Sequence, residues 1–306
     1  MIKTIPNGVF PTMVTPFTAD NKIDYNGVEQ LLEWYDKKGV AGIFAICQSS
    51  EIFFLSFEEK LELLRFIVKN APKGMSIVAS GHTEDDLDKQ IYQANQFINE
   101  GIDAYVFISN RFAKADENDD IFLKNADYVV KNIPEIALGV YECPYPYKRV
   151  LTPEVMKKLV NSGPFRFLKD TCCNTEEIKK KLDAVKGTDF KIYNANAATL
   201  LETLNDGVAG YSGVMANFHP EIYTELCNCY KTDPEKAKKL QDLVGFFSVA
   251  ECQMYPVNAK YYLTLEGLDI SYNCRVKAAS EFTRNRKLEI DQMHALTQDL
   301  KKIYNV

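Results

Sequence analysis

Short apolar runs alternate with longer segments of helical period along most of the chain. Each short run ends in a polar loop, which is typical of a buried strand, and each longer segment repeats apolar residues every three or four positions. The pattern predicts eight strands, over residues 8–14, 41–46, 76–80, 104–108, 137–141, 165–169, 190–193 and 210–215. Eight strands alternating with helices indicate an α/β fold, a (β/α)8 TIM barrel.

Helix start and stop signals separate the predicted strands. Asp24 is the expected N-cap of a helix that ends at Gly39, and the capping box from Ser56 to Glu59 opens the next one. The later barrel helices are predicted over residues 83–99, 119–131, from 152 onward, 174–185 and 198–206.

Beyond residue 220 the chain shows only helical patterns, over 221–231, 234–253, 256–266 and 275–304. We interpret residues 1–220 as the barrel, and residues 221–306 as its last helix plus a C-terminal helical extension packed on it. No linker, low-complexity tract or further repeat divides the chain.

Composition limits the classes of function. The chain has 306 residues, 46% hydrophobic and 25% charged, as in ordinary soluble globular proteins. Its net charge of −6 gives no basic footprint for nucleic acid. No apolar run approaches the ~18 residues of a membrane span, and the N-terminus lacks the apolar core of a signal peptide. We therefore expect a cytoplasmic protein with neither a nucleic-acid nor a membrane partner.

The eight cysteines show no metal-ligand spacing, and the three histidines are scattered. We expect reduced cysteines and no metal site, because a zinc site needs clustered thiolates and imidazoles.

One lysine sits at an unusual place. Lys169 ends the sixth predicted strand, where an apolar run gives way to a polar loop. Burial disfavours the ammonium group, so a lysine there is either paired with a carboxylate, such as that of Asp170, or used as an amine nucleophile towards a carbonyl. This stretch alone favours the ion pair.

The active sites of such barrels lie at the C-terminal ends of the strands. Tyr141 and Lys169 end neighbouring predicted strands, and a phenol beside an amine could act as an acid–base and Schiff-base pair. The loop at 48–51 offers hydroxyl and backbone N–H groups that could hold a carboxylate.

At these residues the sequence resembles the dihydrodipicolinate synthase / N-acetylneuraminate lyase family of class I aldolases. The resemblance covers essentially the whole chain and rests on residues 11–17, 47–51, 141–144, 168–170 and 210–217, in order and with matching spacing. It implies a 2-oxo acid substrate of the pyruvate type, no external cofactor and a homotetramer.

The resemblance also implies roles for single residues. Lys169 would form an imine with the ketone, Tyr141 would shuttle protons, and Ser49 would bind the carboxylate and pass protons to Tyr141. The backbone N–H groups of Ser49 and Ser50 would take the other carboxylate oxygen. The expected substrate-binding residues are Gln48, Ser50, Arg111, Asn196, Ser212 and Gly213.

Three departures from the family pattern are visible. Cys47 and Ser50 replace loop glycines, and Gln48 replaces a hydroxyl. The segment at 109–112 lacks the relay tyrosine that the family usually carries there, so that relay is expected to be absent. Arg111 in the same segment either holds a second anionic group or is a solvated interface residue.

Three hypotheses follow. The first is a Schiff-base lyase or aldolase acting on a 2-oxo acid, in particular a sugar-acid derivative. The second is a dehydratase of 2-keto-3-deoxy sugar acids that uses the same imine. The third is a catalytically silent barrel that binds a small acid. The intact pair of Lys169 and Tyr141 argues against the third, while the altered positions Gln48 and Arg111 leave it open.

Overall fold

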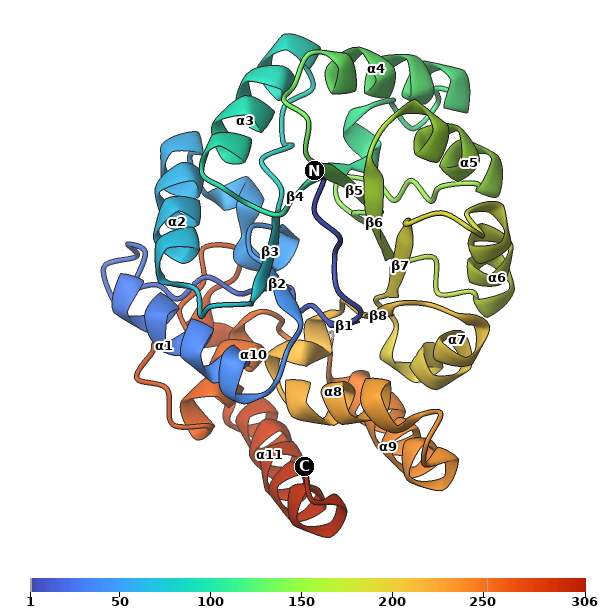
Figure 1. The fold of residues 1–306 in the computed structure, drawn as a ribbon. Coiled ribbons are helices and arrows are strands. Elements are labelled where there is room, and N and C mark those ends of the chain that lie inside the picture. The colour runs from blue at the N-terminus through green and yellow to red at the C-terminus, as the bar shows by residue number, and fades with distance from the viewer. Residues whose placement is uncertain (1, 252) are drawn as a thin grey trace.

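The computed structural model of the chain describes residues 2–251 and 253–306. Eight parallel strands stand in the order β1-β8-β7-β6-β5-β4-β3-β2, and a parallel bridge between Thr12 and Phe44 joins β1 to β2 and closes the ring. Figure 1 looks into this ring. The predicted (β/α)8 barrel is confirmed, with strands β1 Gly8–Val9, β2 Gly42–Phe44, β3 Ser76–Ala79, β4 Ala104–Ile108, β5 Ala137–Tyr141, β6 Phe165–Asp170, β7 Lys191–Asn194 and β8 Gly210–Tyr211.

Helices surround the strands (Figure 1). Asp24 caps α1 by accepting a hydrogen bond from the N–H of Gly27, and Ser56 and Glu59 form the expected capping box of α2. The barrel helices are α1 Tyr25–Lys37, α2 Phe57–Asn70, α3 Leu87–Asn99, α4 Asp119–Lys131, α5 Pro153–Ser162, α6 Thr175–Ala184, α7 Leu200–Asp206 and α8 Pro220–Cys229. The extension contains α9 Pro234–Phe247, α10 Val257–Leu265 and α11 Arg284–Tyr304.

Aromatic side chains fill the inside of the barrel. The ring of Phe167 stacks on Tyr193 at 4.6 Å between centroids and meets the edges of Phe10 and Phe44. Gly42 makes room for this cluster, because a Cβ there would come within 2.4 Å of the Phe10 ring. The interior is therefore a packed core, and any cavity must lie above it, at an end of the barrel.

Several predicted elements have different bounds, among them the first strand, which was expected over 8–14 and ends at Val9. The eighth strand was expected to reach Met215, but β8 ends at Tyr211, whose carbonyl accepts from the N–H of Phe10. Beyond Gly213 the chain turns into a 3-10 helix at Val214–Asn217 in place of a longer strand.

The helix expected over 275–304 begins only at Arg284. The backbone N–H groups of Arg275 and Val276 both donate to the carboxylate of Glu51, at 2.6 and 2.8 Å. These donors bind a side chain from a distant loop, so the local helical pattern is overridden.

The helix expected over 234–253 also ends early. α9 ends at Phe247 and is followed by a 3-10 turn at Ser248–Ala250, where the Ser248 hydroxyl donates to the carbonyl of Gly245. Residue 252, in the predicted range, lies outside the described residues. The helix expected from residue 83 begins at Leu87, because Asp86 caps it.

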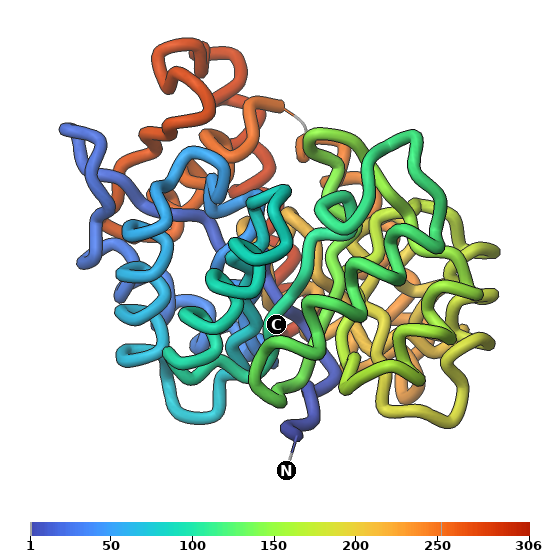
Figure 2. The backbone as a smooth tube through the Cα atoms, turned by 90° about the horizontal axis from the view of Figure 1, so that it is seen from above, coloured from blue at the N-terminus to red at the C-terminus, as the bar shows by residue number. Residues whose placement is uncertain are grey.

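The extension covers one end of the barrel. In Figure 2 the segment between α9 and α11, coloured orange to red, lies at the end opposite the one from which the N-terminus emerges. Gln241 on α9 bonds to the backbone of Ala197 and Leu201, next to β7. The buried ammonium group of Lys260 on α10 pairs with Glu51 at 2.8 Å. The extension is thus fixed to the loops that follow the strands.

Within the described ranges, the structure contains no helix with the length and apolarity of a transmembrane span.

Candidate active site

A cavity of about 550 Å³ opens where the strands end. Its walls include six residues that the sequence singled out: Gln48, Ser49, Tyr141, Lys169, Asn196 and Gly213. The opposite wall belongs to the C-terminal extension and the loops around it, with Ser248, Glu251, Tyr255, Pro256, Val276 and Lys277. The barrel and the extension therefore build the cavity together.

Lys169 and Tyr141 lie side by side at the bottom of this cavity. Strands β5 and β6 pair in parallel register, with Tyr141 opposite Lys169. The Lys169 side chain is only 3% exposed, and its Nζ lies 4.3 Å from the centroid of the Tyr141 ring. Burial lowers the pKa of Lys169, which increases the fraction of the neutral amine, the nucleophilic form.

Asp170 does not pair with Lys169. Its carboxylate binds Lys181 of α6 at 2.5 Å, and the same ammonium group binds Glu142 at 2.7 Å. The ion-pair interpretation of Lys169 through Asp170 is thus wrong, since Asp170 turns to the other side of the strand.

Lys181, Glu142 and Asp170 form a buried cluster behind the reactive pair. Glu142 also accepts the backbone N–H groups of Leu151 and Thr171. Burial, and then the neighbouring Asp170, raise the pKa of Glu142 to about 7. Glu142 directly follows Tyr141 and Asp170 directly follows Lys169, so the cluster ties together the ends of β5 and β6.

The Tyr141 phenol donates a hydrogen bond to Oε1 of Gln48 at 3.2 Å. The ring packs edge-on against Phe44 at 5.6 Å. Burial raises the pKa of Tyr141 well above its usual value, so the phenol remains protonated and able to donate.

In the loop after β2, Ser49 faces the cavity and Ser50 does not. The Ser49 hydroxyl lies at the cavity wall and donates to Thr12 at 3.0 Å. The Ser50 hydroxyl is buried and donates to the carbonyls of Met13 and Ala45. The backbone N–H of Ser50 donates to the carbonyl of Cys47, so both donors of Ser50 are engaged within the protein.

Ser212 and Arg111 also lie outside the cavity walls. Ser212 is fully buried. The guanidinium of Arg111 binds Asp85 at 2.7 Å and lies over the ring of Phe53. The structure thus places Ser50, Ser212 and Arg111 outside the cavity walls, and their contact with the substrate stays a prediction.

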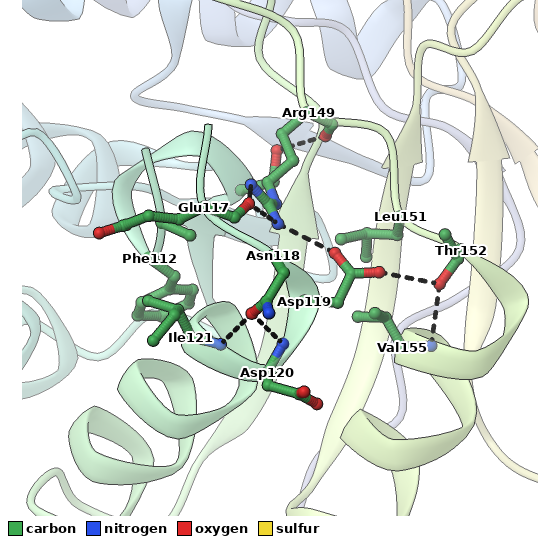
Figure 3. Close-up of polar contacts among 12 residues, drawn as sticks. Phe112, Glu117, Asn118, Asp119, Asp120, Ile121, Arg149, Leu151, Thr152 and Val155 are labelled. Carbon is green, nitrogen blue, oxygen red and sulfur yellow. Dashed lines mark hydrogen bonds and ion pairs between the residues drawn. The ribbon is translucent and has the colours of Figure 1, made fainter. Parts of the chain in front are cut away.

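Lys148 and Arg149, the basic residues that follow β5, point in different directions. Figure 3 shows Arg149 directed to the segment leading into α4, where it binds the carbonyl of Glu117 and the carboxylate of Asp119. Thr152, the N-cap of α5, donates to the same carboxylate. Lys148, by contrast, lines the cavity, and its ammonium group donates to the carbonyl of Thr171 at 2.6 Å.

Sequence reasoning missed the polar side chains that the extension brings to the cavity. Glu251 is its acidic wall residue within the described part of the chain, and Lys277 lies at its rim. The phenol of Tyr255 accepts a hydrogen bond from Asn217 at 3.1 Å, and hydrogen bonding by Ser49 and Thr12 counteracts the rise in its pKa that burial causes. No local pattern marks these residues, because their position depends on how the extension packs.

Across residues 2–251 and 253–306, no group of three or more histidine, cysteine, aspartate or glutamate side chains is arranged to hold a metal ion.

Comparison with known proteins decides the family. The model of the dihydrodipicolinate synthetase family matches residues 5–295. The chain belongs to this family. It is accordingly an aldolase-type carbon–carbon lyase.

The curated relatives have low sequence identity, but the similarity extends over most of each chain. A 4-hydroxy-tetrahydrodipicolinate synthase from Pseudoalteromonas atlantica is 23% identical over 263 residues, covering 85% of this chain and 88% of the relative. A protein from Pyrococcus furiosus described as an uncharacterised DapA-like lyase is 28% identical over 254 residues, covering 79% and 82%.

Solved structures share the fold. YagE, a prophage protein of the dihydrodipicolinic acid synthase family from E. coli K12, was solved in complex with pyruvate; it superposes with a TM-score of 0.85 at 21% identity, covering 96% of this chain and 98% of its own. A pyruvate complex of dihydrodipicolinate synthase from Acinetobacter baumannii gives a TM-score of 0.86 at 21% identity, covering 96% and 99%. Another neighbour with a TM-score of 0.86, at 19% identity and covering 96% and 98%, is described as a monomeric dihydrodipicolinate synthase variant.

Proposed function

We propose that this lyase forms a Schiff base between Lys169 and the ketone of a pyruvate-type 2-oxo acid and makes or breaks a carbon–carbon bond next to it. The observation that carries the proposal is the buried amine of Lys169, which lies over the Tyr141 ring with no carboxylate bonded to it among the described residues. A neutral amine of this kind is the nucleophile that imine chemistry requires.

The reaction starts when Lys169 Nζ adds to the ketone carbon and the resulting carbinolamine loses water. In the cleavage direction a base removes the proton of the hydroxyl on C4, the C3–C4 bond breaks, and its electron pair moves to the imine nitrogen. An aldehyde leaves, and the enamine is protonated at C3. Water then hydrolyses the imine and frees both Lys169 and the shortened 2-oxo acid.

The wall residues have distinct roles in this scheme. Tyr141 shuttles the protons of the carbon–carbon step, since its phenol is protonated and directly adjacent to Lys169. Ser49 holds the carboxylate of the 2-oxo acid, and its hydroxyl proton turns from Thr12 to the carboxylate when the substrate binds. Gln48, Asn196 and Gly213 border the rest of the substrate.

The size and polarity of the cavity support a sugar-acid derivative. A volume of about 550 Å³ exceeds the needs of pyruvate alone, and the wall offers amide, hydroxyl and charged groups that suit a polyhydroxylated acid. The lysine supplies the electron sink, so the scheme needs no external cofactor.

Trapping the imine tests the proposal. The protein is incubated with pyruvate and borohydride, its intact mass is measured and the modified peptide is mapped. We expect a reduced adduct on Lys169 that disappears in Lys169→Ala. A matched control is Lys277→Ala, which removes a lysine from the same cavity and should retain the adduct. An adduct that persists in Lys169→Ala would refute the assignment.

A dehydratase of 2-keto-3-deoxy sugar acids is the second candidate. One contact favours it. The Tyr141 phenol donates to the side-chain amide oxygen of Gln48, and an amide relays a proton less readily than a hydroxyl group would. An adduct with 2-keto-3-deoxygluconate and none with pyruvate would select this reaction. No adduct with either acid would leave the silent barrel as the better account.

We further propose a homotetramer, on the basis of the family resemblance, and a cytoplasmic location. Light scattering coupled to size-exclusion chromatography tests the assembly, and a mass of one chain would contradict it.

A further inference from the structure

The extension places a carboxyl group in the cavity that the proposed scheme does not yet use. Glu251 follows the 3-10 turn after α9 and lies in the cavity wall opposite the strand ends. It is the acidic residue of that wall within the described chain, whereas the basic residues number three, Lys148, Lys169 and Lys277.

Hydrogen bonds hold the backbone that leads into Glu251. Its N–H donates to the carbonyl of Ser248 at 3.0 Å, and the preceding carbonyl of Ala250 accepts from the Asn258 amide at 3.1 Å. Gln241, earlier on α9, ties the helix to the backbone after β7. The carboxyl group therefore belongs to a fixed segment.

Glu251 and Lys169 influence each other without touching. Among the described residues, they form no direct ion pair, yet each belongs to the electrostatic surroundings of the other. Burial raises the pKa of Glu251 and lowers the pKa of Lys169, and the charge of each partly counteracts the shift of the other. Burial thus shifts both groups towards their neutral forms, and both line the same cavity.

A neutral carboxyl group near a neutral amine matches the charge changes of one reaction step, the loss of water from the carbinolamine. When a carbinolamine becomes an imine, its C–O bond breaks, the hydroxyl leaves with an added proton as water, and the nitrogen lone pair forms the C=N bond. The step turns a neutral carbinolamine into a cationic imine, and the acid that supplies the proton becomes an anion. An acid in the wall of the same cavity supplies that proton.

We propose that Glu251 is the general acid that protonates the leaving hydroxyl of the carbinolamine at Lys169, and the base that recovers the proton when water hydrolyses the imine. This inference rests on the proposed Schiff-base function and extends it to a residue outside the barrel. Tyr141 keeps the proton transfers of the carbon–carbon step.

Several other titratable and charged groups lie near Glu251. The nearby titratable groups are Lys169 on β6 and the phenols of Tyr211, Tyr223 and Tyr255. The charged groups elsewhere in the cavity wall are Lys148 and Lys277. Burial raises the pKa of each phenol, so they stay neutral below pH 9 and Glu251 is the carboxyl that can change charge at this face.

A rapid-quench experiment with pyruvate tests the inference without an aldehyde substrate. The protein is mixed with pyruvate, quenched with borohydride at increasing times, and the reduced adduct is quantified by intact mass between pH 5 and 9. For Glu251→Gln we expect the rate of adduct formation to fall by about 100-fold or more, with the same final yield. An acid changes the rate of this step but not its equilibrium.

The pH profile and two further variants complete the test. The wild-type rate should decline on the alkaline side as Glu251 loses its proton, and Glu251→Gln should lack that decline. Glu251→Asp should recover part of the rate. The control Glu235→Gln makes the same charge change on the exposed surface of α9 and should behave as the wild type.

The possible results distinguish a failure of the role of Glu251 from a failure of the proposed function. An unchanged rate in Glu251→Gln, or a loss of both rate and final yield, would overturn the role of Glu251 while leaving the Schiff base intact in the wild type. A wild type that forms no adduct with pyruvate or with 2-keto-3-deoxygluconate would overturn the proposed function itself, and this inference with it.

Discussion

Replacing Lys181 with methionine tests what holds the two reactive strands together. The change keeps the apolar stem and removes the ammonium group that Glu142 and Asp170 share at 2.7 and 2.5 Å. The side chains of both acids have 0% exposure, so water cannot take the place of the cation. Removing one partner of a buried ion pair costs about 3–5 kcal/mol, because the remaining charge stays buried. We expect Lys181→Met to lose about this much of a total stability of about 5–15 kcal/mol.

Urea unfolding at pH 7, followed by circular dichroism and by the fluorescence of Trp34, measures the loss. The control is Lys180→Met, at the preceding residue of α6, whose exposed ammonium group pairs with exposed Glu177. That variant should leave the midpoint unchanged, because exposed pairs contribute little.

The pH dependence supplies a second check. Burial raises the pKa of Glu142 from 4.5 to about 7, so the folded state binds its proton more tightly than the unfolded state does. Stability from this group is therefore fully present below pH 4.5 and declines as the pH rises towards 7. Without Lys181 the acids become still harder to ionise, so the deficit of Lys181→Met should be smaller at pH 5 than at pH 8. A loss below about 1 kcal/mol, or equal deficits at both pH values, would refute the reasoning.

Three further changes separate chemistry from architecture. Tyr141→Phe should slow turnover by about 100-fold or more while the borohydride adduct with pyruvate still forms; an unchanged turnover rate would make Tyr141 a structural residue. Lys260→Met leaves the buried carboxylate of Glu51 without its cation and should cost about 3–5 kcal/mol in urea unfolding, a prediction that a wild-type midpoint would exclude. Arg111→Ala should change KM for the 2-oxo acid less than twofold in steady-state assays, because its guanidinium binds Asp85 outside the cavity; a KM raised about tenfold would return Arg111 to the substrate site.

The sequence alone was sufficient to predict the barrel fold and to place Tyr141 beside Lys169. Strands such as β4 are buried at every position, so they appear as unbroken apolar runs, and the alternation with helices follows directly. Tyr141 and Lys169 could be predicted as neighbours because both end consecutive strands of a parallel barrel, whose ends meet at one face.

Contacts over long sequence separations were not predictable in this way. Asp170 could have neutralised Lys169, and only the packing of α6 against the strands shows that Lys181 takes its carboxylate instead. The start of α11 depends on Glu51, which is more than 200 positions away. Glu251 and Tyr255 reach the cavity through the course of the extension, which has no local signature.

The carboxylate of Glu51 has a consequence for the order in which the protein folds. Glu51 immediately follows the loop that carries Gln48 and Ser49, and it holds both Lys260 and the backbone at Arg275, 209 and 224 positions later. Contacts of such sequence separation form after local ones, because a long loop must close first. During synthesis, strand β6 and its lysine therefore emerge well before the wall that encloses them. Enclosure of the reactive amine is thus a late event, coupled to completion of the whole chain, and a truncated product would expose an open barrel end in place of a finished pocket.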